Sequence, residues 1–150
     1  MKQYVLILNG PNLNLTGERE PEIYGTRTLD DILEGLRDQY PDLAFGTLQS
    51  NHEGELIDAI HETRHIPECV GIVLNAGAYS HTSLALADAI SAVSTPVVEV
   101  HMSNVAARGG LRATSLIAPV CVGSITGFGA LGYSLAVLAL LSRNNLLPLQ

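Results

Sequence analysis

The sequence predicts an α/β protein built on a doubly wound, five-stranded parallel sheet. Short apolar runs without alternation recur along the 150-residue chain, as expected for strands that are buried on both faces of a parallel sheet. Segments with helical spacing of apolar residues separate these runs. Regular alternation of strands and helices favours parallel crossover units. The expected architecture is therefore flavodoxin-like, a three-layer sandwich with helices on both faces of the sheet.

Each element rests on a local pattern. The strands are expected at residues 4–8, 44–49, 70–74, 96–101 and 118–122, where the apolar runs lie. The helices are expected at residues 28–40, 53–65, 82–93 and 128–143. Thr28 with Asp31 three positions later matches a capping box, which marks the start of the first helix. No repeat or linker interrupts the pattern, so residues 1–150 are expected to form a single domain.

The last helix is apolar on nearly all sides. Its run FGALGYSLAVLALL, residues 128–141, is shorter than the roughly 20 residues that a membrane span needs. Two interpretations stay open: the helix is covered by its own sheet, or it is buried against another subunit. The opening MKQYVLIL is too short for a secretory signal. We therefore expect a cytoplasmic protein that does not enter a membrane.

Charge and special residues narrow the classes of function. A formal charge of −7 argues against a nucleic-acid binder, which would present a basic face. Lys2 is the only lysine and precedes the first strand, so carbonyl chemistry here would proceed without a Schiff base. Cys69 and Cys121 lie in apolar runs without C-x-x-C spacing. They are interpreted as buried, non-catalytic thiols of a reducing compartment.

Polar residues gather where the expected strands end. Asn9 and Asn12 follow the first strand, Asn75 follows the third, and Glu99 with His101 closes the fourth. The carboxyl ends of parallel strands form the edge at which such sheets bind ligands. For Asn9, a purely structural role in a turn is the favoured interpretation, because asparagine often stabilises turns. For Asn12 and Asn75, a functional role is favoured.

The sequence predicts neither a cofactor nor a metal. The glycines of GSITGFGALG, residues 123–132, lack the G-K-[ST] of a phosphate loop and a later acidic residue for a ribose. His61 and His65 have a spacing that metal ligands use, but no third ligand accompanies them. Solvated side chains on a charged helix face are the other interpretation of this pair.

Five motifs carry a resemblance to a known family. They are NGPNLN at residues 9–14, GEREPEIYG at 17–25, SNHEGE at 50–55, NAGAYSHTS at 75–83 and EVHMSN at 99–104. In this order and spacing, the motifs resemble those of the type II 3-dehydroquinate dehydratases, from about Val5 to Tyr133. The family's flavodoxin-like fold agrees with the fold class inferred above from the apolar pattern.

The resemblance implies a hydro-lyase of the shikimate pathway, which supplies chorismate and the aromatic amino acids. Members of this family convert 3-dehydroquinate reversibly to 3-dehydroshikimate by anti elimination of water through an enolate, without a cofactor. The lack of a lysine other than Lys2 fits the type II route, because the unrelated type I enzymes form an imine with a lysine of their active site.

The resemblance also assigns catalytic roles. Tyr24 would be the base that removes the proton beside the ketone, and Arg19 would favour its ionised form, since an ordinary tyrosine ionises only near pH ~10. His101 would be the general acid for the departing hydroxyl. Glu99, two residues earlier on the same sheet face, would orient it. Asn12 would help to hold a water that stabilises the enolate oxygen.

Further positions are implied to bind the substrate. This set comprises Asn75, His81, Ser103, Arg112, the backbone of Met102, Arg108 near an active-site lid, and Asp88, which would contact the site of a neighbouring subunit. The family assembles as dodecamers of four trimers, so the expected partners are the small-molecule substrate and further copies of this chain.

Two other classes of function stay open. Residues 105–115 depart from the family pattern, with Gly109 and Gly110 in place of polar residues, and Ala76 stands where relatives usually have proline. A catalytically inactive scaffold of the same family is therefore one alternative. A flavodoxin-like binding module is another, although the first strand ends in Asn-Gly-Pro without an acidic pair.

Overall fold

The computed structural model describes residues 1–146, except for the side chains of Ile23 and Tyr24. Its strands are β1 (Gln3–Asn9), β2 (Leu43–Gln49), β3 (Cys69–Asn75), β4 (Val97–His101) and β5 (Gly123–Thr126). They form one parallel sheet in the order β2-β1-β3-β4-β5. In this flavodoxin-like order the chain adds β2 on one side of β1 and the later strands on the other side, beginning with β3. The switch point between β1 and β3 is where such sheets bind ligands.

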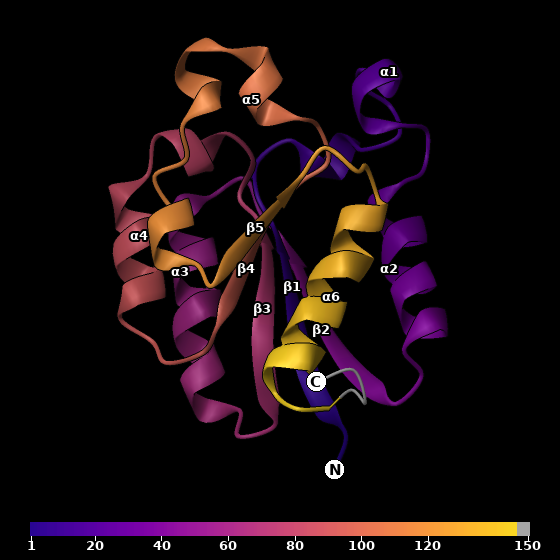
Figure 1. Ribbon diagram of the computed structural model, residues 1–150, viewed down its shortest axis with the longest axis vertical. Coiled ribbons are helices and arrows are strands. Elements are labelled where there is room, and N and C mark those ends of the chain that lie inside the picture. Colours follow the sequence, from indigo (N-terminus) through magenta and orange to yellow (C-terminus); the bar gives the residue numbers. More distant parts are fainter. Residues whose placement is uncertain (147–150) are drawn as a thin grey trace.

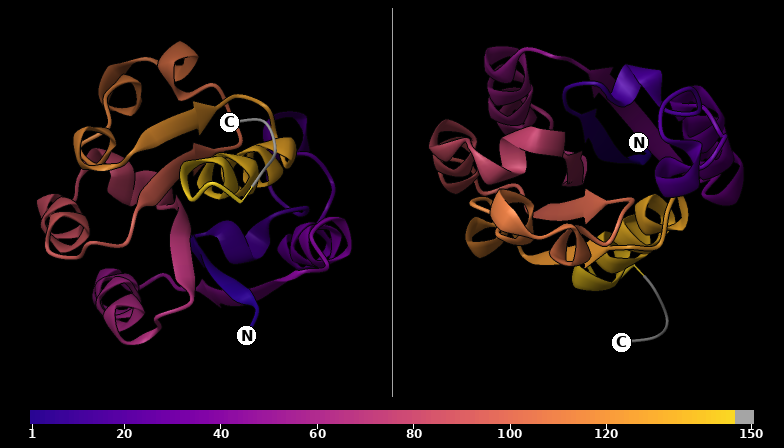
Figure 2. Two further views of the ribbon diagram at one scale, coloured as in Figure 1. Left: turned by 60° about the horizontal axis from the view of Figure 1, so that its bottom comes forward. Right: turned by 90° about the horizontal axis from the view of Figure 1, so that it is seen from above.

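The helices are α1 (Pro21–Tyr24), α2 (Leu29–Gln39), α3 (Glu53–Glu62), α4 (Leu84–Ser91), α5 (Val105–Arg108) and α6 (Leu131–Arg143), with short 3-10 turns η1 (Leu13–Leu15), η2 (Thr63–His65), η3 (Gly77–His81), η4 (Gly110–Ala113) and η5 (Ala118–Val120). Helices α2 and α6 cover one face of the sheet, and α3 and α4 cover the other (Figures 1 and 2). The three-layer sandwich is therefore confirmed.

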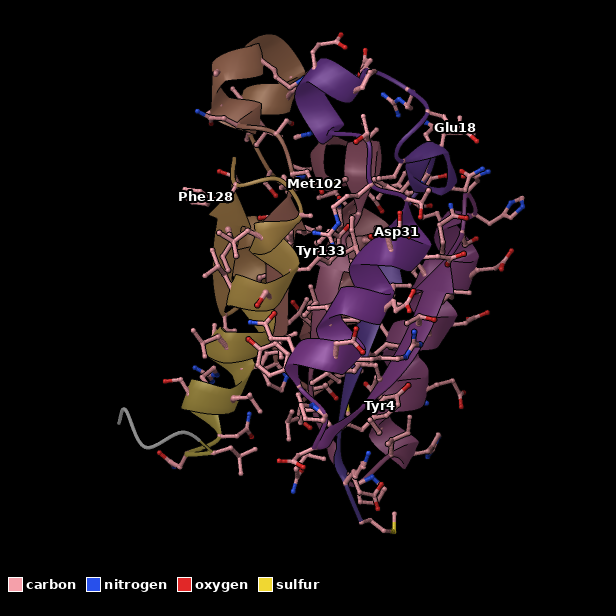
Figure 3. The ribbon with its side chains drawn as sticks, turned by 90° about the vertical axis from the view of Figure 1, so that its right-hand side faces the viewer. Tyr4, Glu18, Asp31, Met102, Phe128 and Tyr133 are labelled. Atoms are coloured by element: carbon pink, nitrogen blue, oxygen red, sulfur yellow. The ribbon has the colours of Figure 1, made fainter. Side chains whose placement is uncertain are left out.

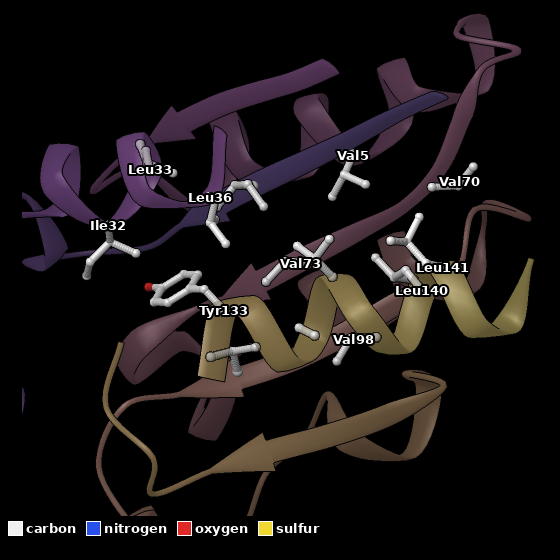
Figure 4. Packing of buried hydrophobic residues seen from close by; sticks show 14 of the residues in the cluster. Val5, Ile32, Leu33, Leu36, Val70, Val73, Val98, Tyr133, Leu140 and Leu141 are labelled. Carbon is white, nitrogen blue, oxygen red and sulfur yellow. The ribbon is translucent and has the colours of Figure 1, made fainter. Parts of the chain in front are cut away.

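Successive side chains of each strand point to opposite faces of the sheet, so the hydrophobic core has two halves. Val5 and Ile7 of β1 face α2 and α6, whereas Leu6 and Leu8 face α3 and α4. Figure 4 shows the first half, in which the ring of Tyr133 packs with aliphatic side chains of α2, α6 and three strands. Burial on both faces explains why these strands read as continuous apolar runs.

The expected start of the first helix is confirmed in detail. Thr28 caps α2, its side chain accepting from the Asp31 amide while the Asp31 carboxylate accepts from the Thr28 amide. This reciprocal pair satisfies two amide groups that a helix start otherwise leaves without partners.

The position expected for the fifth strand was wrong. Residues 118–120 form the turn η5, and β5 begins only at Gly123. Pro119 lacks an amide hydrogen and its fixed φ suits a turn start better than a central strand. The true β5 is a short, largely exposed edge strand, so it carries no apolar run by which it could be recognised.

The last helix begins later than expected and is covered mainly by its own sheet. Gly127 and Gly129 have φ of +94° and +59°, which a helix cannot accommodate, and α6 starts at Leu131. Most of its apolar side chains pack on β3 and β4, while Phe128 and Leu131 remain exposed. Figure 3 shows Phe128 at the outer edge and Tyr133 in the interior. Within residues 1–146, no helix is both long and apolar enough to cross a membrane.

The two cysteines are half-buried, which corrects the expectation that both are buried. Both are unpaired thiols. Burial raises the pKa of Cys69, and burial together with the nearby Glu99 carboxylate raises the pKa of Cys121 to about 12. A thiol with a raised pKa is a poor nucleophile at neutral pH, which agrees with a non-catalytic interpretation of both residues.

Candidate active site

Two asparagines meet at the switch point of the sheet. Asn9 and Asn75 are the last residues of β1 and β3, and they are partners in the strand register. Gly10 follows Asn9 and donates its amide to the carbonyl of Asn75 at 2.7 Å. A Cβ at Gly10 would collide with the backbone of Ala76, so only glycine allows this close approach of the two strand ends.

A pocket of about 80 Å³ opens at this edge and is lined partly by residues of α5 and of the segment that leads to α1. Figure 1 shows both elements above the same end of the sheet. Nine of the residues expected in a site line it: Asn12, Arg19, Asn75, His81, His101, Met102, Ser103, Arg108 and Arg112. These residues come from loops after three different strands. The structure thus brings together groups that are up to about a hundred positions apart in the sequence.

Behind the pocket, Glu99 and His101 form a buried pair. The exposed fractions of these residues are 1% and 5%, and His101 Nε2 lies 2.8 Å from a carboxylate oxygen of Glu99. A carboxylate can only accept, so Nε2 carries the proton that is donated in this bond. His101 is left with Nδ1 as the ring nitrogen that can exchange a proton with a ligand.

Two serine hydroxyls complete the surroundings of Glu99. Ser115 donates to Oε2 at 2.6 Å, and Ser124 donates to Oε1 at 2.8 Å. Burial raises the pKa of Glu99, but the hydrogen bonds from its three donors outweigh burial and hold the pKa below its usual range. The carboxylate therefore stays charged at neutral pH and holds the imidazole of His101 in a charge-assisted hydrogen bond.

His81 stacks on His101 at the pocket wall. The ring centroids lie 5.9 Å apart, and the ring planes are inclined by 21°. His81 Nδ1 lies 2.7 Å from the carbonyl oxygen of Thr114. Since that oxygen only accepts, Nδ1 is the protonated nitrogen, and Nε2 is left for a ligand.

Asn12 occupies a strained position that another motif supports. Its φ is +68°, a left-handed conformation that is uncommon outside glycine. The amide of Asn12 donates to Asn51 Oδ1 at 3.0 Å, and the carbonyl of Asn51 accepts from the Tyr79 hydroxyl at 2.7 Å. The SNHEGE segment thus helps to fix the backbone of Asn12, a function that its sequence alone did not indicate.

Three arginines give the pocket a positive field. Arg19 precedes α1 and forms an ion pair with Glu20 at 3.2 Å, while Arg108 and Arg112 belong to α5 and η4. Gly109 lies between these two short elements and Gly110 begins η4, with φ of +71° and +59°. Both values lie in the region that glycine adopts without strain. The unusual glycine pair therefore shapes the turn that carries both arginines over the pocket.

Besides Glu99, which lies behind the pocket wall, two predicted residues are not among those that line the pocket. The backbone of Tyr24 ends α1, but its side chain lies outside the described part of the structure. Asp88 is exposed on α4 and does not line the pocket of its own chain.

Reasoning from the sequence missed several residues that hold the site. Asn9 is buried and bonded to the Tyr133 hydroxyl, so it does more than stabilise a turn. Ser115 and Ser124 hold the carboxylate, and Asn51 holds Asn12. The one available signal was the occurrence of single polar residues, such as Tyr133, in otherwise apolar segments.

A metal centre finds no support among the described residues. Across residues 1–146, no group of three or more histidine, cysteine, aspartate or glutamate side chains is placed to hold an ion. His61 and His65 lie near the carboxyl end of α3 and in η2, and neither lines the pocket.

The fold and the pocket define an α/β protein with an arginine-lined pocket at the switch point of a parallel sheet, beside a histidine oriented by a carboxylate. The family model described as Dehydroquinase class II matches residues 3–141. The chain belongs to this family.

Individual relatives and a solved structure support membership of this family. The chain is 56% identical to a 3-dehydroquinate dehydratase of Ruegeria pomeroyi over 91% of each chain. It is 52% identical to that of Chlorobaculum tepidum over 94% of this chain and 95% of the relative. Among solved structures, the type II dehydroquinase of Butyrivibrio crossotus matches with a TM-score of 0.88 and 40% identity, over 93% of this chain and 97% of the other.

Proposed function

We propose that this chain is a 3-dehydroquinate dehydratase that removes water from 3-dehydroquinate to give 3-dehydroshikimate, in the shikimate pathway. The observation that carries the proposal is the buried Glu99–His101 pair opening onto an arginine-lined pocket. It occurs in a family whose curated relatives bear this activity in their names. We treat residues 1–150 as a single domain of this type.

The proposed reaction begins with removal of the proton beside the ketone. Tyr24 is the proposed base, and Arg19 on the preceding loop is the proposed cation that favours its ionised form. Asn12 is proposed to help hold a water against the enolate oxygen, which needs hydrogen-bond donors as negative charge develops there. No covalent link to the protein is required at any step.

The second step is departure of the hydroxyl. His101 is proposed to protonate the leaving oxygen from Nδ1, since Nε2 is committed to Glu99. Glu99 is a positioning residue that keeps the imidazole in one orientation and stabilises its cationic form. Glu99 is itself ionised because His101, Ser115 and Ser124 donate hydrogen bonds to its carboxylate.

The remaining polar groups are proposed to bind the substrate. Arg112, with Arg108 on the covering turn, supplies positive charge for the carboxylate, which arginine recognises well. Asn75, His81, Ser103 and Met102 line the same pocket. We propose that the first three side chains and the Met102 backbone bind hydroxyl groups of the substrate.

The proposal predicts turnover without an imine. The purified protein should convert 3-dehydroquinate to a conjugated enone, detected by its ultraviolet absorbance. Borohydride added during turnover should leave the mass of the intact chain unchanged, because the only lysine, Lys2, precedes β1 at the end of the sheet away from the pocket. A folded protein with no turnover would support the inactive scaffold instead, and a ligand-sized adduct at Lys2 would contradict the enolate route.

We also propose that the chain assembles into trimers and then into a dodecamer. Asp88 and Leu84 lie one helical turn apart on α4, where Leu84 is 67% exposed. Phe128 and Leu131 add further exposed apolar surface. A closed assembly would cover these side chains and would place Asp88 against a neighbouring pocket.

This assembly predicts a mass of about twelve chains in light scattering, with trimers on dissociation. Asp88→Ala should weaken substrate binding, although Asp88 does not line its own pocket. Asp58→Ala, on the exposed side of α3, is the matched control and should bind normally. A fully active monomer would contradict both the assembly and the role of Asp88.

We propose a cytoplasmic location. The support is the biosynthetic role of the family and the two unpaired cysteines, which are usual in a reducing compartment.

A further inference from the structure

A buried hydrogen-bond relay links helix α6 to the floor of the pocket. Tyr133, in the first turn of α6, has no exposed surface. Its hydroxyl accepts from Asn75 Nδ2 at 2.9 Å and donates to Asn9 Oδ1. Since Asn9 and Asn75 are register partners on β1 and β3, one hydroxyl joins both strands at the switch point.

The hydrogen-bond partners determine which group donates and which accepts in each bond of this relay. The amide of Gly77 donates to Asn75 Oδ1 at 3.2 Å, which identifies the oxygen of that side chain and leaves Nδ2 to face Tyr133. The tyrosine must then use its own hydrogen toward Asn9. Burial raises the pKa of Tyr133, so the hydroxyl stays neutral and cannot act as a base in the reaction.

The relay determines what Asn75 offers to a ligand. Of the two N–H groups on Nδ2, one goes to Tyr133, and the described residues provide no partner for the other. Asn75 also lines the pocket. A flipped amide would place its N–H groups against the Gly77 amide, leaving buried donors unsatisfied. Asn75 Nδ2 therefore has one N–H left for a ligand in the pocket, in an orientation that Tyr133 and Gly77 determine.

We propose that Tyr133 is a positioning residue of the active site: with Asn9 and Gly77, it locks the Asn75 side chain so that one N–H points at an oxygen of the bound substrate. This inference rests on the proposed function and goes beyond it by assigning a role to a buried residue of α6 that does not line the pocket. Tyr133 itself does not touch the substrate.

The test is Tyr133→Phe, which keeps the ring and removes only the hydroxyl. We expect kcat/KM for 3-dehydroquinate to fall about tenfold or more, because an untethered amide loses its alignment with the substrate. Tyr40→Phe is the matched control, since the Tyr40 hydroxyl bonds to Ser134 on the same helix but away from the pocket. It should stay within about twofold of the parent in kcat/KM.

A double-mutant cycle separates positioning from simple stability. If Tyr133 acts through Asn75, Tyr133→Phe should cost little or nothing further in an Asn75→Ala background. Fully additive losses, or equal losses in the Tyr133 and Tyr40 variants, would overturn the proposal. Should Tyr133→Phe fail to fold, Asn9→Ala breaks the relay from its other end and should show the same non-additivity with Asn75→Ala.

A readout independent of turnover keeps this inference distinct from the proposed function. In NMR spectra of isotope-labelled protein, the Asn75 side-chain amide should show one N–H protected from solvent exchange. The protection should be lost in Tyr133→Phe and kept in Tyr40→Phe. Rapid exchange in the parent would refute the relay, whatever substrate the protein uses.

Discussion

Replacing Tyr24 by phenylalanine should remove nearly all turnover while leaving the protein folded. General-base catalysis contributes about 100-fold to 10,000-fold to a rate, and phenylalanine preserves the ring but cannot accept a proton. We therefore expect kcat to fall within that range and KM to change by less than about threefold. Steady-state kinetics with 3-dehydroquinate, together with thermal unfolding of each variant, measures both quantities.

Tyr4→Phe provides the control for this variant. Tyr4 lies near the amino-terminal end of β1, at the opposite end of the sheet from Met102 and the pocket (Figure 3). It should retain the activity of the parent. If Tyr24→Phe kept activity within tenfold of the parent, Tyr24 would not be the base.

Replacing His101 by alanine should block departure of the hydroxyl more strongly than proton removal. We expect elimination to fall by about 100-fold or more, since the general acid is lost. Exchange of the proton beside the ketone with deuterated solvent should persist at a higher relative rate, because the base is untouched. Mass spectrometry of recovered substrate measures exchange, and ultraviolet absorbance measures elimination.

Glu99→Gln tests whether the pair acts as a unit. The amide oxygen can still accept from His101 Nε2, but the negative charge that stabilises the imidazolium is gone. The loss should affect the same step as in His101→Ala and be smaller. If exchange and elimination fell by one common factor in both variants, His101 would have another role or the two steps would be concerted.

The fold class was largely predictable from local patterns. Strands buried on both faces are apolar nearly throughout, so β1 and β3 can be recognised in the sequence as continuous apolar runs. The capping box at Thr28 is likewise a local arrangement. The exposed edge strand β5 was misplaced because a strand with little burial carries no apolar pattern, and Pro119 lies in the neighbouring run that does.

The site was predictable to the extent that its residues occur in short motifs. Nine of the expected residues meet in one pocket, because the carboxyl ends of parallel strands share one edge of the sheet. The pairing of Glu99 with His101 also follows from sequence, since residues two apart on a strand share a face.

Only the tertiary structure decided which distant side chains hold those residues in place. Ser115 reaches Glu99, Asn51 reaches Asn12, and Tyr133 joins Asn9 to Asn75 across 124 and 58 positions of the chain. A hydrogen bond depends on donor and acceptor lying within about 3 Å, and no local pattern encodes that distance for residues on separate elements. The sequence by itself determined the sheet, the edge at which the pocket opens and the candidate reacting groups, because these depend on local patterns, while packing of α6 against the sheet determined how the floor of the pocket is held.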